Sequence, residues 1–393
     1  MTEAMMSEVS ENKHNQYDEG SGIAVSGNAD EGKLLKVENA VTVNGAQANE
    51  SRNWRFDFHG TANEYFKIWI VNLFLSVITL SFYAPWAKVR RLRYFYGNTV
   101  LGRDKFDFTA IPARILIGRI IATVLFVAFS LLSNIDPMYS SAVLLLAFAL
   151  MPWLVRSTMR FRARNTKYGN SRFYFSATMG QSYWVLAKCA VVTVLGAGLL
   201  YPLALYWFKS YQIKHLHIGN LRFNLNTGVG GFYGAVLKPL LFIVLLVAAA
   251  VLVLFGMGYV SDLGYVLSDR VVFPLVYLLI MLPYIAVLGF FIPLTQGYLF
   301  RATWQDVSVG NSRITTDLNP YKYALIKLTN YIAAIFTLGL LLPWGAVRLY
   351  RYQAQSLQVE LQDNPQDLMN MAQNDPDAIG EEIADVFDID ISL

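Results

Sequence analysis

Four long apolar stretches dominate the pattern of hydrophobic and polar positions along the chain. Each is long enough to cross about 30 Å of hydrocarbon as a helix that rises about 1.5 Å per residue. Short links join the first stretch to the second and the third to the fourth, so the pattern predicts two transmembrane hairpins. Their spans are expected at residues 115–132, 138–155, 240–257 and 271–294.

A shorter apolar segment occurs three times, and each copy leads through a proline into a basic stretch. Internal similarity of this kind constrains the architecture more than any single motif does. The copies cover about residues 54–108, 173–225 and 313–358. Their corresponding positions are Asn72 and Asn330; Thr79 and Thr337; Ser81, Gly198 and Gly339; Pro85, Pro202 and Pro343; Trp86 and Trp344; Arg90 and Arg348; and Arg93-Tyr94 and Arg351-Tyr352.

Each copy is interrupted in its middle, at Ser81, Gly198 or Gly339, and a proline follows four residues later. Glycine relaxes the backbone and proline removes a hydrogen-bond donor, so a continuous helix is disfavoured there. Basic residues also flank both sides of each copy, which a simple span would place on opposite sides of the membrane. We therefore expect three re-entrant helical hairpins. The alternative of seven ordinary spans satisfies hydropathy equally well but violates the charge rule at one or more loops.

Short strands are expected between the helical segments. A Gly-x-x-basic-apolar pattern starts at Gly102, Gly169, Gly219 and Gly310, and alternating aromatic positions follow the first three. A glycine turn before residues of period two is typical of a strand entered through a tight turn. The predicted fold class is a mainly α, polytopic membrane protein with three re-entrant and two transmembrane hairpins, in which the short strands form a small cytoplasmic cap.

Charge divides the chain of 393 residues into three regions. Residues 1–50 hold nine acidic side chains and three lysines, and residues 360–393 hold ten acidic and no basic ones. Their low apolar content predicts disordered acidic tails at 1–50 and 361–393, around a membrane domain at 51–360. The basic residues of that domain flank apolar runs, which indicates the cytoplasmic side of a membrane rather than a nucleic-acid surface. Both termini are therefore expected in the cytoplasm.

Polar side chains inside the apolar stretches are the candidate binding residues. Ionisable groups are costly at membrane depth, and asparagine or threonine can bond a solute, a neighbouring helix or the free carbonyls of a broken helix. The candidates are Asn72, Thr79, Arg119, Lys188, Lys327, Asn330 and Thr337. Structural pairing remains the alternative role for each of them.

No enzyme signature is present. The sequence has no glycine-rich phosphate loop, no nucleophile elbow and no helical histidine pair at metal spacing, so neither catalysis nor a metal or other cofactor is expected. The single cysteine, Cys189, excludes a disulfide framework. Expected partners are the lipid bilayer and anionic lipid headgroups at the basic face, with no nucleic acid.

The run Thr79-Leu80-Ser81, followed by Tyr83, Pro85-Trp86 and Arg90, resembles the YjgN-like family of bacterial inner-membrane proteins. The resemblance covers roughly residues 54–358. It implies the inner membrane of a bacterium, and it brings no established activity, substrate or catalytic residue.

Two functions are weighed for such a protein. The first is a transporter or binder of a small solute or lipid at a site framed by the three broken hairpins, since interrupted helices recur at transporter sites. The second is a non-transporting membrane scaffold or envelope-maintenance protein. A membrane enzyme comes third.

Overall fold

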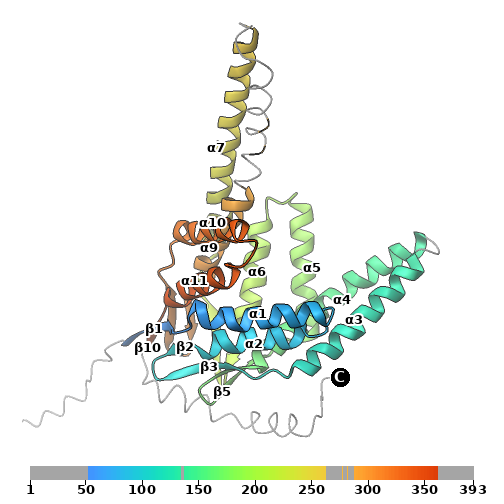
Figure 1. Cartoon of the computed structure of the whole chain (residues 1–393), viewed down its shortest axis with the longest axis vertical. Coiled ribbons are helices and arrows are strands. Elements are labelled where there is room, and N and C mark those ends of the chain that lie inside the picture. Colours follow the sequence, from blue (N-terminus) through green and yellow to red (C-terminus); the bar gives the residue numbers. More distant parts are fainter. Residues whose placement is uncertain (1–51, 134–136, 263–276, 278–280, 282–286, 362–393) are drawn as a thin grey trace, which may run out of the picture. The chain divides into compact units, whose positions relative to one another are not determined.

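The computed structural model describes residues 52–133, 137–262, 277, 281 and 287–361 (Figure 1). The acidic tails expected at 1–50 and 361–393 lie outside the described residues except for Leu361. Most of the span expected at 271–294 lies outside them as well.

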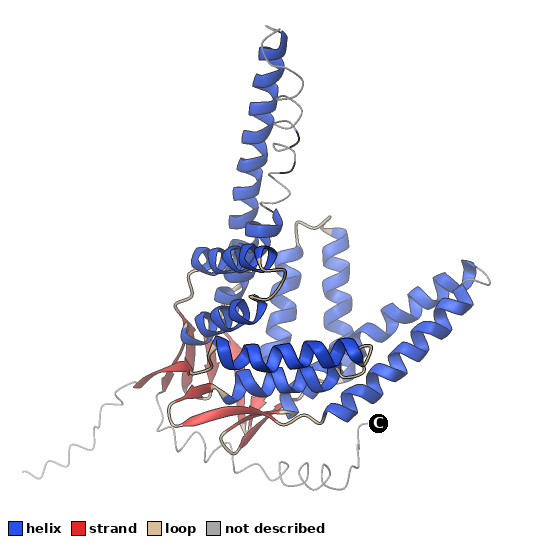
Figure 2. Cartoon of the chain, viewed as in Figure 1, coloured by secondary structure: helices blue, strands red, loops and turns tan. Residues whose placement is uncertain are grey.

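Ten strands form a closed antiparallel barrel (Figure 2). Each strand pairs with its neighbours in sequence, and the first strand pairs with the last to close the ring. The strands are β1 (Arg52–Phe58), β2 (Thr99–Leu101), β3 (Asp104–Phe108), β4 (Thr166–Tyr168), β5 (Ser171–Phe175), β6 (Leu216–Ile218), β7 (Leu221–Leu225), β8 (Val307–Val309), β9 (Ser312–Thr316) and β10 (Leu357–Leu361).

The helices are inserted as connections between paired strands. The described helices are α1 (Ala62–Ile78), α2 (Ala84–Gly97), α3 (Pro112–Ser133), α4 (Pro137–Arg164), α5 (Met179–Leu195), α6 (Tyr201–Lys214), α7 (Val229–Asp262), the π-helical turn η1 (Val287–Phe291), α9 (Ile292–Trp304), α10 (Pro320–Phe336) and α11 (Leu342–Gln355). Because neighbouring strands run in opposite directions, the long helical connections all leave from one rim of the barrel, which we call the helix rim. The tight turns at Gly102, Gly169, Gly219 and Gly310 lie at the other, the turn rim.

Alternating side chains of the strands fill the barrel interior. The ring of Phe106 lies 5.8 Å from that of Phe56 and 6.5 Å from that of Phe173. Phe173 in turn lies 6.1 Å from Phe223, so aromatic rings follow one another around the inside. Burial and the charge of Asp104 raise the pKa of Tyr168 to about 12, which keeps this inward phenol neutral. The barrel is thus a packed apolar core.

Polar side chains cover the outside of the barrel. Arg313 on β9 forms an ion pair of 2.8 Å with Asp306, and Arg55 on β1 lies 3.3 Å from Asp317. Burial tends to raise the pKa of Asp306, but hydrogen bonds from Arg313 and Asn226 outweigh it and the pKa is lowered. A charged outer face indicates that water, not lipid, surrounds the barrel.

The expected fold class is wrong in its account of the strands. They do not form a small cap on a mainly α protein; they close the barrel that carries the helical connections. Three helices in the described part are long and apolar enough to cross a membrane, at Pro112–Leu131, Ser141–Arg164 and Val229–Val253. The ring is completed by four strands of three residues each, which are β2, β4, β6 and β8. Three residues are too few to show a period-two pattern in the sequence.

The three similar segments fold alike. Each is a helix of 17 residues, a short turn and a helix of 14 residues: α1–α2, α5–α6 and α10–α11. The turns contain left-handed residues, with φ of 70° at Ser81, 83° at Gly198 and 91° at Gly339. The hairpins expected as re-entrant and those expected as transmembrane do not form two separate classes. Each of them, short or long, is a helical connection between two strands that pair with each other, and we call this unit a module.

Candidate functional site

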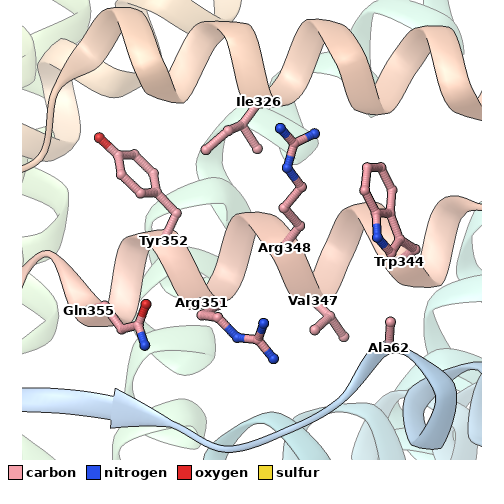
Figure 3. A pocket seen from close by; sticks show the side chains of 8 residues that line it. All are labelled: Ala62, Ile326, Trp344, Val347, Arg348, Arg351, Tyr352 and Gln355. Carbon is pink, nitrogen blue, oxygen red and sulfur yellow. The ribbon is translucent and has the colours of Figure 1, made fainter.

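A groove of about 250 Å³ runs along α11, between α10 and the first residue of α1 (Figure 3). Both basic and aromatic side chains line it, and its lining contains no carboxylate. The lining residues are Ala62, Ile326, Trp344, Val347, Arg348, Arg351, Tyr352 and Gln355. We call this feature the α11 groove.

Helical spacing places the lining of the α11 groove in two rows (Figure 3). Trp344, Arg348 and Tyr352 follow one another at intervals of four residues and point toward α10. Arg351 and Gln355 point toward the start of α1. Because α11 begins at the hairpin turn and ends beside β10, Trp344 marks the end near the turn and Gln355 the end near the barrel. The groove is therefore more apolar toward the turn and more polar toward the barrel.

Both arginines of the groove have neutral partners. Nη1 of Arg348 donates to Thr329 Oγ1 at 2.7 Å and to Asn330 Oδ1 at 3.4 Å, and its guanidinium lies 5.1 Å from the Trp344 ring. Nη2 of Arg351 donates to the carbonyl oxygen of Gly60 at 2.8 Å. These contacts hold the side chains in place, and no carboxylate of the described residues pairs with either guanidinium.

The α10–α11 hairpin that carries the groove is fixed at its base by Tyr352. The Tyr352 hydroxyl accepts a hydrogen bond of 2.9 Å from the Asn319 amide and lies 3.1 Å from the Asn319 carbonyl oxygen. Asn319 also caps α10, since its side chain accepts from the amides of Tyr321 and Lys322. In the first copy Tyr94 does the same, with its hydroxyl donating to the Thr61 carbonyl at 2.8 Å.

The arginine before each of these tyrosines ties one module to the next. Nε of Arg93 on α2 donates to the carbonyl oxygen of Phe108, where β3 leads into α3. Arg351 on α11 makes the corresponding bond to Gly60, where β1 leads into α1, and so joins the last module to the first. The groove thus lies where the ring of modules closes. The repeated Arg-Tyr pair is the sequence signal for this contact, but as part of a basic flank it does not by itself predict which module the arginine reaches.

Thr79 and Thr337 are engaged in the hairpin turns. Oγ1 of Thr79 donates to the Leu75 carbonyl at 2.7 Å and accepts from the Tyr83 amide at 3.0 Å. Thr337 makes the same two contacts, with Ala333 at 2.7 Å and Leu341 at 3.1 Å. These hydrogen bonds account for the recurring threonine as a residue that joins the two helices of its hairpin.

Arg119 reaches a neighbouring hairpin. Its Nη1 donates to the Ser81 carbonyl oxygen at 3.0 Å, so a basic side chain of α3 satisfies a backbone group of the α1–α2 turn. This carbonyl belongs to a residue with φ of 70°, where the helical hydrogen-bond pattern is broken. Arg119 therefore supports the turn.

Replacing Arg119 by methionine should destabilise the protein by about 1.5–3 kcal/mol, the range for a hydrogen bond made by a charged group. Thermal unfolding of the purified protein in detergent, followed by tryptophan fluorescence, measures the change. Thr123→Val one turn along α3 removes only a hydrogen bond within the helix and is the control. Equal melting temperatures for the two variants would show that Arg119 does not support the turn.

The two corresponding asparagines differ in their surroundings. Nδ2 of Asn330 donates to the Gly345 carbonyl at 2.9 Å, and a Cβ at Gly345 would lie only 3.0 Å from Asn330. The first copy has Ala87 at the position of Gly345. There Asn72 is buried, with 7% of its surface exposed, and its Oδ1 has no hydrogen-bond partner among the described residues. Of the two, Asn330 alone contacts a residue of the α11 groove.

Lys188 and Lys327 lie on different hairpins. The ammonium of Lys188 on α5 is 3.5 Å from the centre of the Trp207 ring of α6. Lys327 on α10 hydrogen-bonds Gln296 of α9 and lies 5.4 Å from the Tyr323 ring. Neither side chain lines the α11 groove, so the candidate binding residues are distributed over several modules rather than gathered at one site.

The residues of the repeated motif shape the second helices. Pro85, Pro202 and Pro343 occupy the first turn of α2, α6 and α11, where a missing amide donor costs nothing. Trp86 and Trp344 are partly exposed. Arg90 donates to the Tyr83 hydroxyl at 3.3 Å, whereas its counterpart Arg348 enters the groove. Of these two arginines, Arg348 is the one that lines the α11 groove.

A family comparison matches residues 53–386 to a model described as "Bacterial protein of unknown function (DUF898)". The chain belongs to this family. Its similarity to inner membrane protein YjgN of Escherichia coli K12 is 27% identity over 147 residues, 37% of either chain. The chain thus spans 37% of the length of that relative.

A second relative of this DUF898 member is inner membrane protein YjgN of Salmonella typhimurium. It is 23% identical over 356 residues, which cover 80% of this chain and 90% of the relative. No solved structure matches the chain. The expected YjgN-like family is confirmed, and the protein is an inner-membrane protein of unknown function.

Proposed function

We propose that this protein is a multi-pass protein of the bacterial inner membrane that binds an anionic amphiphile, such as a phospholipid, in the α11 groove. The observation that carries the proposal is the pair Arg348 and Arg351, held by neutral partners in a groove without carboxylates. Guanidinium groups match phosphate oxygens in geometry and charge. An anionic headgroup would supply the missing countercharge.

The surroundings of the groove suit the apolar part of such a ligand. A groove of about 250 Å³ can hold a headgroup but not two acyl chains. Beside it, α10 exposes large apolar side chains, with 52% of Leu325, 46% of Ile332 and 84% of Phe336 accessible. Acyl chains lying along α10 would cover this surface, while the phosphate sits near Arg348 and Arg351.

A multi-pass arrangement is favoured by the long helices. The apolar windows of α3, α4 and α7 are 0%, 6% and 6% buried within the protein, so lipid is the natural medium for them. Their basic flanks lie next to the barrel, as at Arg114 in the first turn of α3 and at Arg162 and Arg164 in the last turn of α4. We therefore place the barrel in the cytoplasm. Because β1 begins and β10 ends at the turn rim, both ends of the described chain lie on that side.

Binding is favoured over conduction through the barrel. The interior holds the neighbouring rings of Phe56, Phe106, Phe173 and Phe223, which form a packed core in the place where a solute would pass. A scaffold function is the second candidate, and the polar outer face of the barrel favours it.

The proposal is tested by lipid retention. The variant Arg348→Gln/Arg351→Gln removes both charges, and Arg90→Gln/Arg93→Gln removes their counterparts on α2, including the analogous bond from Arg93 to Phe108. The proteins are exchanged into nanodiscs of phosphatidylglycerol and phosphatidylcholine, and native mass spectrometry counts bound lipid after release.

We expect the groove variant to retain at least tenfold less phosphatidylglycerol, since one charged hydrogen bond contributes about 1.5–3 kcal/mol. The α2 variant should retain as much as the unmodified protein. Equal retention by the two variants, or no preference of the unmodified protein for the anionic lipid, would refute the function.

A further inference from the structure

The barrel end of the α11 groove is formed by Gln355, the last residue of α11. Its Nε2 donates to Oδ1 of Asp57 on β1 at 3.4 Å. Because an ionised carboxylate can only accept hydrogen bonds, this contact fixes which end of the carboxamide faces the strand. Figure 3 shows the nitrogen on the side of β1 and the oxygen turned away from it. Oε1 accepts no hydrogen bond from any residue that the structure describes, so this end of the groove offers a free acceptor.

The neighbouring polar groups of the groove have other roles. The Tyr352 hydroxyl is engaged on both sides, by the amide and the carbonyl oxygen of Asn319. Arg351 uses Nη2 for the Gly60 carbonyl, and a guanidinium has further N–H donors that can bind a phosphate. Gln355 is therefore the side chain at this end that can distinguish one headgroup from another.

The order of groups along α11 matches the order of groups in a phospholipid. Arg351 and Gln355 lie one helical turn apart, about 6 Å at about 1.5 Å per residue, and point to the same side (Figure 3). With the acyl chains on α10 and the phosphate at Arg351, the headgroup substituent would lie beside Gln355. A substituent without a donor would remove water from Oε1 and give no hydrogen bond in return, which costs binding free energy.

We propose that the α11 groove selects, among phospholipids of equal charge, those whose headgroup carries hydroxyl groups, such as glycerol, and that Gln355 accepts a hydrogen bond from that hydroxyl. This inference rests on the proposed function, because it concerns the same ligand in the same groove. Asp57 is a positioning residue, which holds the carboxamide nitrogen so that the oxygen is left for the ligand.

Competition between phosphatidylglycerol and phosphatidylethanol tests the selection. Both lipids carry one negative phosphodiester, and they differ in the hydroxyl groups of the headgroup, so the ratio in which they are retained cancels the effect of charge. The full chain is exchanged into phosphatidylcholine nanodiscs that contain equal amounts of the two lipids with the same acyl chains. Native mass spectrometry then counts each lipid bound after release.

Three variants accompany the unmodified protein. Gln355→Met keeps the length of the side chain and removes the acceptor, and Asp57→Ala frees the carboxamide to turn. Gln353→Met is the matched control, since Gln353 lies on the same helix and does not line the groove.

We expect the unmodified protein and Gln353→Met to retain about threefold or more phosphatidylglycerol over phosphatidylethanol, as for one neutral hydrogen bond. The ratio should fall to about one in Gln355→Met and by about half or more in Asp57→Ala, while phosphatidylethanol stays bound. A ratio near one in the unmodified protein, or a ratio that Gln355→Met leaves unchanged or that Gln353→Met lowers equally, would overturn the selection. Retention of both anionic lipids at equal levels would leave the proposed function standing, whereas retention of neither above phosphatidylcholine would refute both.

Discussion

Replacing Gly102 by alanine should lower the free energy of unfolding by more than about 4 kcal/mol, a size that marks severe steric conflict. Gly102 forms the turn between β2 and β3 with φ of 64°, and the Trp54 side chain lies directly against it. A Cβ at this position would overlap the Trp54 ring. Relief would require moving a large side chain out of the barrel, beside the seam where β1 meets β2. Thermal unfolding in detergent measures the loss.

Gly310→Ala is the matched control for this prediction. Gly310 has φ of 57° in the turn between β8 and β9, so alanine meets the same left-handed backbone. Its Cβ would lie 3.1 Å from a terminal methyl carbon of Leu221, which can move. We expect about 1–2 kcal/mol here, the cost of the backbone conformation alone. Equal losses at the two glycines would contradict the placement of Trp54 over Gly102.

Replacing Phe223 by alanine should cost about 3–5 kcal/mol, as is usual for an aromatic residue removed from a packed core. Phe223 on β7 is 6% exposed, and its ring packs against that of Phe173 inside the barrel. The next residue, Asn224, points outward, so Asn224→Ala should change stability by less than about 0.5 kcal/mol. Guanidinium unfolding of both variants separates the two positions. Comparable effects would mean that the strand does not alternate between core and solvent as described.

Local signals in the sequence located the hairpin breaks. Ser81, Gly198 and Gly339 stand where the backbone turns left-handed, and a proline four residues later lies in the first turn of the next helix. Backbone preference and a missing donor act within a few residues, so a sequence pattern can show them. They say nothing of which strand lies beside which.

The barrel could not be predicted in this way. Its closure brings residues 52–55 against residues 358–361, a pairing between opposite ends of the described chain. Four of its ten strands have three residues, too few to show an alternation of inward and outward positions. The modules also differ in length, because some carry a short hairpin and one carries the long α3–α4 hairpin. This difference in length does not indicate that all of these hairpins connect paired strands.

The candidate site was found only in part for a related reason. Polar residues inside apolar stretches, such as Thr79 and Thr337, are predicted to bind a ligand because water is absent at membrane depth. In the structure their hydrogen bonds instead close the hairpin turns. Arg351 and Tyr352 lie beyond the apolar stretch and read as a basic flank. Their position in the groove depends on Ala62, which is brought near α11 only by closure of the ring.

The central claim is that the two ends of the described chain meet in one barrel, and a disulfide across that seam tests it most directly. Asn53 on β1 and Glu360 on β10 are register partners, and such partners lie about 4.5–5.5 Å apart at Cα, within the range of a disulfide. Asn53→Cys/Glu360→Cys is made with Cys189→Ser, oxidised mildly and cleaved between the two sites by protease. We predict that the fragments stay joined until reduced, while the pair Asn53→Cys/Arg222→Cys, on strands that are not neighbours, separates. Fragments that separate for the first pair, or that stay joined equally for both, would contradict the closed barrel.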